Sequence, residues 1–218
     1  MRIFAIAASF ILVTTMFACG RSMVTPSPIV FFKPVSTSTP MPTATPLTFI
    51  YYSQRDPLWS EIVLTCSNRH KSTFLHQGCG ETSFAMLMST FVDPKYTPAT
   101  VLNDFYGYTY CTGTDSSYSA ELLREQGFTV LGVYTDIAEV KEYVRTGWFA
   151  WMHVEYYENS KRIGHEVIVI GVDENNNFLV TDPFYGVGSV GDSQFPYTES
   201  NIIGFYIVKP PAKQTINP

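Results

Sequence analysis

Gln77-Gly78-Cys79-Gly80-Glu81-Thr82-Ser83-Phe84-Ala85-Met86-Leu87-Met88 is the stretch that decides the fold of this chain of 218 residues. Apolar side chains recur in it at helical spacing and would bury one stripe in a core. They are Phe84, Leu87, Met88 and, just beyond, Phe91. Thr82 and Ser83 are expected to cap or open the helix. The stretch therefore predicts an apolar helix with a cysteine in its first turn.

Cys79 lies between two glycines at the start of this helix. The unpaired backbone N–H groups and the helix dipole at that end favour a negatively charged thiolate. Glycines on both sides would let a substrate backbone approach the sulfur. The pattern indicates a nucleophile, although a buried structural cysteine, the common state of free cysteines, is the alternative.

The overall composition excludes several function classes. The net charge is −5, with 15% charged and 45% hydrophobic residues, so no basic field for nucleic acid is present. The cysteines and histidines lack metal-ligand spacing, and no nucleotide-binding loop is present, so neither metal nor cofactor is expected. A monomer acting on a peptide or protein substrate fits this composition best.

The amino terminus predicts export. Met1-Arg2 is followed by an apolar run over 3–17 and then by Ala18-Cys19-Gly20, the layout of a bacterial secretory signal. Cys19 falls where a lipoprotein would be cleaved and lipidated. We expect residues 1–19 to be a lipoprotein-type signal that anchors the protein on the outer face of the cell membrane. A plain signal peptide with secretion, or an uncleaved anchor, is the alternative.

Residues 20–47 are rich in proline, threonine and serine and predict an extended tether. Residues 48–209 suit one globular domain, and 210–218 form a tail. In the domain we expect a strand over 49–52, a surface loop over 61–77, helices over 97–107, 117–126 and 136–147, and strands over 128–134, 148–157, 165–173, 178–181 and 202–208. A further loop is expected over 186–194. Helices followed by strands predict an α+β domain with the Cys79 helix packed on a twisted antiparallel sheet.

A thiol nucleophile needs a base, and the base needs a partner that orients it. His165 begins a buried strand, and Asp182 ends the next one, so a hairpin through 174–177 would make them neighbours. Each also has an ordinary interpretation, as a capped polar residue and as a turn initiator before Pro183. His153 is a rival base without a turn or an acid beside it. His70 and His76, in the loop before the nucleophile, are weaker candidates still.

Four segments resemble the signature blocks of one family: Tyr52–Trp59, Gly78–Ser83, Gly164-His165 and Asp182-Pro183. They resemble the bacteriocin-processing (double-glycine leader) peptidases, and more closely the broad secreted branch of these papain-like cysteine peptidase domains. The resemblance implies Cys79 as nucleophile, His165 as base and Asp182 as its orienting partner. It further implies that Gln54 and the backbone N–H of Cys79 donate to the oxyanion. Glu81 stands where the branch commonly has proline, and an anion there disfavours a thiolate.

The leading hypothesis is thus an extracellular, membrane-tethered thiol hydrolase that cleaves amide bonds through an acyl-enzyme. A catalytically silent module that binds peptide or cell-envelope material on the same fold is the alternative. A cell-wall amidase of the Cys-His-His type fits less well, because Asp182-Pro183 occupies the third position. Counting also suggests a disulfide between Cys66 and Cys111, since lipidation takes Cys19 and catalysis needs Cys79 free. Two separately buried, reduced cysteines are the alternative to this bridge.

Overall fold

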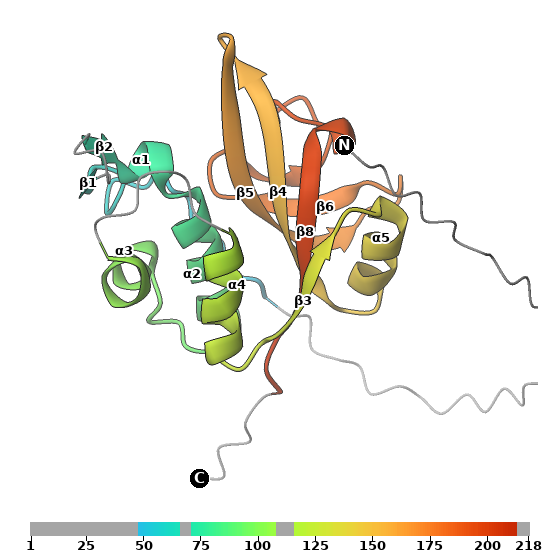
Figure 1. Cartoon of the computed structure of the whole chain (residues 1–218), viewed down its shortest axis with the longest axis horizontal. Helices are drawn as coiled ribbons and strands as arrows, with labels where there is room; N and C mark the ends of the chain where they lie inside the picture. Colours follow the sequence, from blue (N-terminus) through green and yellow to red (C-terminus); the bar gives the residue numbers. More distant parts are fainter. Residues whose placement is uncertain (1–47, 66–70, 108–115, 213–218) are drawn as a thin grey trace, which may run out of the picture. The chain divides into compact units, whose positions relative to one another are not determined.

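A computed structural model describes residues 48–65, 71–107 and 116–212 of the chain. The helices are α1 (Phe74–Gln77), α2 (Cys79–Phe91), α3 (Pro98–Val101), α4 (Ser116–Glu125) and α5 (Ile137–Arg145), with a π-helix over Leu102–Tyr106 and a 3-10 turn over Glu199–Asn201. The strands are β1 (Val63–Thr65), β2 (Lys71–Thr73), β3 (Thr129–Tyr134), β4 (Phe149–Glu158), β5 (Lys161–Val172), β6 (Phe178–Asp182), β7 (Gly186–Ser189) and β8 (Ile202–Lys209). Figure 1 shows α1 to α4 grouped beside a sheet that carries α5.

The main sheet has six antiparallel strands in the order β3-β8-β4-β5-β6-β7. β4 and β5 pair along nearly their whole length, from Ala150 opposite Val169 to Glu158 opposite Lys161. β6 then pairs with the second half of β5, which brings its last residue back toward the start of β5. The predicted α+β class, with the cysteine helix packed on an antiparallel sheet, is confirmed.

Two hydrophobic clusters cover the two faces of the sheet. The first joins the helices to it and includes Phe84 and Leu87 of α2 with Trp151 and Ile168 of β4 and β5. The second lies on the other face, where Val140 of α5 packs with side chains of β5, β6 and β8. Helix α2 is buried from Cys79 to Ser89, so the sheet and the other helices hold it on all sides. The position of its first residue is therefore set by the core.

Several predicted helix ends are correct. Thr97 caps α3 by accepting a hydrogen bond from the Thr100 N–H, and Asp136 caps α5 by accepting from Ala138 and Glu139. Gly127 follows α4 with φ +86°, a conformation that favours glycine over other residues. Within the described ranges, no helix is both long and apolar enough to cross a membrane.

Other expectations were wrong. Residues 49–52 form no strand, because the backbone of Ile50 bonds the Thr90 hydroxyl and Phe49 packs on Phe91 and Phe149. The expected loop over 61–77 contains β1, β2 and α1, which are held by the fully buried Leu64 and Phe74. The expected loop over 186–194 begins with β7, which pairs with β6. Contacts distant in sequence determine the first case, whereas β1 pairs with β2 and β7 pairs with β6 over short separations in the sequence.

The start of α2 also differs from expectation. The helix begins at Cys79 after Gly78, with no side-chain cap, and Thr82 and Ser83 are fully buried inside it. The connection between the strands expected over 148–157 and 165–173 is shorter than expected, since β4 ends at Glu158 and β5 begins at Lys161. These strands extend past the sheet and form one wall of the cleft described below.

Candidate active site

Cys79 is the first residue of α2 and is reduced and 8% exposed. Gly78 before it is required by packing, because a Cβ there would lie 2.4 Å from the Phe74 ring. The group that lies too close to Gly78 to allow a side chain there is therefore a ring of the protein's own core. This packing fixes the backbone immediately before the sulfur.

His165 lies on β5 and contacts both Cys79 and Asp182. Its Nε2 is 2.9 Å from Oδ1 of Asp182, and the Cys79 side chain is close enough to raise the pKa of the imidazole. Because Nε2 serves Asp182, Nδ1 is the nitrogen left for the sulfur. Tyr185 packs edge-on against the imidazole, with ring centroids 6.0 Å apart. His165 therefore lies between Cys79 and the carboxylate of Asp182.

The electrostatics of His165 favour the imidazolium. Burial is the largest single influence and lowers the pKa of His165. Asp182, followed by Cys79, raises this pKa, and together they raise it by more than burial lowers it. The net result is a pKa of about 10. The surroundings of His165 therefore stabilise its protonated form.

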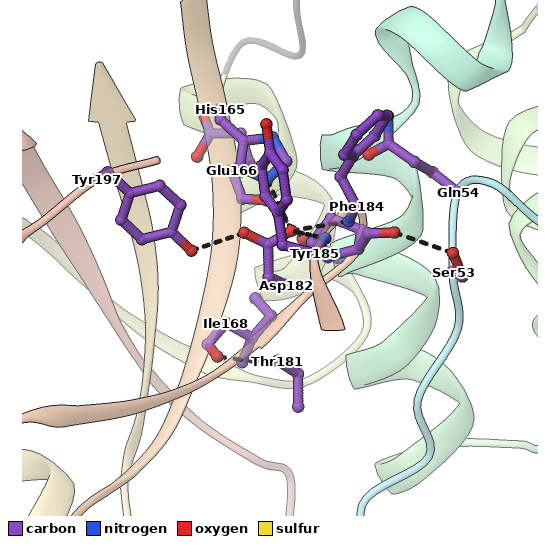
Figure 2. A network of polar contacts seen from close by, with 12 residues as sticks. Ser53, Gln54, His165, Glu166, Ile168, Thr181, Asp182, Phe184, Tyr185 and Tyr197 are labelled. Carbon is purple, nitrogen blue, oxygen red and sulfur yellow. Dashed lines mark hydrogen bonds and ion pairs between the residues drawn. The ribbon is translucent and has the colours of Figure 1, made fainter. Parts of the chain in front are cut away.

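Asp182 ends β6 and is fully buried. Its Oδ1 accepts from the backbone N–H groups of Phe184 and Tyr185 at 2.7 and 2.9 Å, in addition to His165. Its Oδ2 accepts from the Tyr197 hydroxyl at 2.6 Å (Figure 2). Burial would raise the pKa of Asp182, yet His165 and these hydrogen bonds hold it below its ordinary value. The carboxylate is thus kept charged and fixed in orientation.

Gln54 reaches the same site from the amino-terminal segment. Its backbone N–H donates to the Pro183 carbonyl at 2.8 Å, which joins it to the turn after Asp182. Its Nε2 donates to the Leu75 carbonyl at 2.7 Å, and the amide carries a second N–H. Its Oε1 is buried and has no hydrogen-bond partner among the described atoms. Gln54 lines the cleft beside Cys79.

These side chains open onto one cleft of about 230 Å³. Its lining residues come from the segment before β1, from α1, the start of α2, the β4–β5 hairpin and the turn after β6. They are Gln54, Leu75, His76, Cys79, Tyr156, Glu158, Ile163, Gly164, His165, Phe184 and Tyr185. The walls are mainly apolar and aromatic, which suits an extended chain passing over the sulfur. His76, a weak candidate from sequence, belongs to this lining.

His153 differs from its sequence-based description. We expected no acid beside it, but its Nδ1 is 2.7 Å from Oε1 of Glu166 and its Nε2 is 3.6 Å from Oε1 of Glu155. Glu166 lies directly opposite on the neighbouring strand, a pairing that sequence distance conceals. His153 does not line the cleft that holds Cys79. It faces a separate small cavity with Trp151 and Tyr206.

Sequence reasoning missed two side chains that support the site, Tyr197 and Tyr185. Tyr197 follows β7 in an irregular segment, and no local pattern connects it with Asp182. Tyr185 is the third residue after Asp182, where a turn after the carboxylate could have suggested it. Glu81 is buried in the first turn of α2, and its charge adds to the effect of burial in raising the pKa of Tyr106.

Four residues named from the sequence lie outside the described residues: Cys19, Cys66, His70 and Cys111. Lipidation and the disulfide therefore stay predictions. Among the described residues, no group of three or more potential ligands is placed to hold a metal ion.

Comparison with known proteins identifies a family and several similar solved structures. The sequence profile of the Peptidase_C39 like family matches residues 46–205. The peptidase domain of Streptococcus ComA, a bi-functional ABC transporter involved in a quorum sensing pathway, is 19% identical with a TM-score of 0.44, covering 62% of this chain and 91% of that chain. The peptidase domain of Streptococcus mutans ComA is 18% identical with a TM-score of 0.41, covering 62% and 93%. No curated protein matches the chain.

Proposed function

We propose that this chain, which belongs to the peptidase C39-like family, is a cysteine peptidase that hydrolyses peptide or other amide bonds at Cys79. The observation that carries the proposal is the buried series Cys79, His165 and Asp182 at the base of a cleft. A sulfur at a helix start, a base in contact with it and a carboxylate behind the base are the three parts that thiol catalysis needs.

The reaction starts from the ion pair in which the Cys79 proton already resides on Nδ1 of His165, while Nε2–H donates to Asp182. The sulfur then attacks the carbonyl carbon, and the C=O electron pair moves to the oxygen. The backbone N–H of Cys79 and the second N–H of Gln54 would donate to this oxyanion. The C–N bond breaks as the amine takes the proton of His165, which leaves a thioester on Cys79. Water, deprotonated by His165, cleaves the thioester and restores the thiol.

A second candidate is binding without turnover, and one observation favours it. Glu81 places a buried carboxylate in the same helical turn as Cys79, where an anion opposes formation of a thiolate. In this case the cleft would bind peptide or cell-envelope material and release it unchanged.

An electrophilic, peptide-like thiol probe distinguishes the two candidates. We expect rapid labelling at Cys79, located by peptide mass mapping, with loss of labelling in Cys79→Ala and slow labelling in His165→Ala. Hydrolysis of peptide substrates should be abolished in both variants to a similar degree, because a nucleophile and its base act as one unit. Undiminished hydrolysis in either variant, or a wild-type Cys79 that labels no faster than a free thiol, would exclude the peptidase.

We further propose that the enzyme acts outside the cell, held on the membrane by a lipid on Cys19. The apolar run that stops at Ala18-Cys19 supports this proposal. In detergent phase partitioning, the mature wild type should enter the detergent phase, and Cys19→Ser should lack the lipid. A mature protein without lipid mass at its amino terminus contradicts the anchor but leaves the catalytic proposal intact.

A further inference from the structure

A buried hydrogen bond joins the helix of the nucleophile to the strand of the base. Ser83 lies one turn after Cys79 on α2, and its hydroxyl donates to the backbone carbonyl of Glu166 at 3.2 Å. Glu166 directly follows His165 on β5. The bond therefore connects α2, four residues after Cys79, with β5, one residue after His165. Both Ser83 and Glu166 are buried, so water does not compete for it.

The side chain of Glu166 fixes the same point of β5 to β4. Successive side chains of a strand point to opposite faces, so Glu166 points away from the face that His165 uses. Its Oε2 accepts from Trp151 Nε1 at 2.6 Å, and its Oε1 lies 2.7 Å from Nδ1 of His153. Figure 2 shows Glu166 beside His165 on the strand. The carboxylate is thus held by two side chains of β4 directly behind the base.

Titratable groups surround Glu166 from several elements. His153 and, beyond it, Glu155 lie on β4, and Glu155 forms an ion pair with Arg162 of β5. Tyr106 of the π-helix and Glu81 of α2 lie on the helical side. The charges of Glu81 and Glu166 both raise the pKa of Tyr106. Burial raises the pKa of Glu166, while His153, and to a smaller extent His165, lower it. The charge of Glu166 therefore acts on His165 as well as on His153.

We propose that Ser83 and Glu166 are positioning residues that hold the Cys79 helix and the His165 strand at the separation needed for proton transfer. The inference rests on the proposed function and extends it to residues outside the cleft. Neither residue is part of the lining of the cleft that holds Cys79. The hydroxyl of Ser83 fixes the distance between the two elements, and the carboxylate of Glu166 fixes the rotation of β5 against β4. Because proton transfer requires hydrogen-bond distance, a small shift of either element weakens the thiolate–imidazolium pair.

The test measures alkylation of Cys79 by iodoacetamide across pH, together with kcat and KM on a peptide substrate. The variants are Ser83→Ala and Glu166→Gln in the full mature protein. Ser89→Ala is the matched control, since Ser89 is a buried serine of the same helix whose hydroxyl bonds Met86 within α2. Circular dichroism checks that each variant is folded, and two independent variants keep the test valid if one of them fails to fold.

We expect both variants to lose about tenfold to 100-fold in kcat with little change in KM, the scale of a displaced reacting group. The midpoint of the alkylation profile should move up toward about 8.5, the value of an ordinary thiol. Ser89→Ala should match the wild type in both measurements. A folded Ser83→Ala or Glu166→Gln with the wild-type midpoint overturns the inference, even if the variant is less stable. A wild type that itself alkylates as an ordinary thiol and does not turn over overturns the proposed function too, so the two failures are distinguishable.

Discussion

At the scale of single residues, Asp182 and His165 make the stability of the fold depend on pH. The folded pKa of His165 is raised from 6.5 to about 10, so its contribution is complete below pH 6.5 and is lost as the pH rises toward 10. The folded pKa of Asp182 is lowered from 3.8, so its contribution is present above that value and is lost as the pH falls further. Between these limits the pair stabilises the fold most.

Asp182→Asn tests this pair. The variant removes the charge that holds the proton on His165, so the free energy of unfolding should no longer fall between pH 6.5 and 10 as it does in the wild type. Urea denaturation at pH 6, 8 and 9.5 measures the difference. Activity should fall roughly 10²- to 10⁴-fold, since the base is misoriented while the nucleophile remains. An identical pH dependence of unfolding in both proteins would contradict the assigned pair.

Tyr197→Phe tests the support of Asp182. The change removes the hydroxyl that donates to Oδ2 at 2.6 Å and leaves a buried carboxylate oxygen without that donor. We expect a loss of about 1–3 kcal/mol in the free energy of unfolding. Tyr157→Phe is the matched control, because Tyr157 is 76% exposed and should change nothing measurable. Equal stability of the two variants would mean that the Tyr197 hydroxyl does not support the carboxylate.

At the scale of elements, the β4–β5 hairpin carries one wall of the cleft on a strained two-residue turn. Asn159 and Ser160 have φ of 50° and 64°, a conformation that glycine adopts at less cost. Ser160→Gly should therefore raise the free energy of unfolding by about 0.5–1 kcal/mol. Ser160→Val should lower it, since a β-branched residue fits this conformation poorly. Thermal unfolding of the two variants checks the sign, and destabilisation by glycine would contradict the assigned turn.

Helices and strands could be predicted from the sequence where the signal for them is local. Helix α2 was predictable because its apolar spacing is local, and Thr97 and Asp136 were recognisable caps for the same reason. The proximity of His165 and Asp182 could be predicted from the single hairpin that joins their strands.

By contrast, residues 49–52 were expected to form a strand but pair with no strand among the described residues. Strands β1 and β2 lie in a segment that was expected to be a loop. The contacts of Phe49 with Phe91 and Phe149 are distant in sequence and leave no local signal, and the short pairing of β1 with β2 lies in a polar stretch without strand-like alternation.

In the candidate site too, some residues could be predicted from local sequence and others could not. Cys79, His165 and Asp182 stand out because each combines a reactive side chain with a turn or helix end. Glu166 opposite His153 depends on strand register, and Tyr197 reaches Asp182 from an irregular segment. Gln54 was named by resemblance, and only its bonds to Leu75 and Pro183 account for its place beside the sulfur.

At the scale of the whole molecule, the proposed export leads us to expect a disulfide between Cys66 and Cys111. Closing a loop of this length would stabilise the domain by about 3–4 kcal/mol in the chain-entropy model. Peptide mapping without reduction should recover the two cysteines in one linked peptide and Cys79 as a free thiol. Alkylation of Cys66 and Cys111 without prior reduction would rule the bridge out. A Cys66–Cys79 bridge would also undermine the catalytic role of Cys79.

The central claim is that Cys79 forms a covalent acyl-enzyme during amide hydrolysis. Rapid acid quenching of the full protein during turnover of an activated peptide ester or amide, followed by intact mass measurement, tests it most directly. We expect an added acyl mass that maps to Cys79, decays as product accumulates, and is absent in Cys79→Ala. Hydrolysis without an acyl mass on Cys79, or bound peptide that is recovered intact with no adduct, would contradict it.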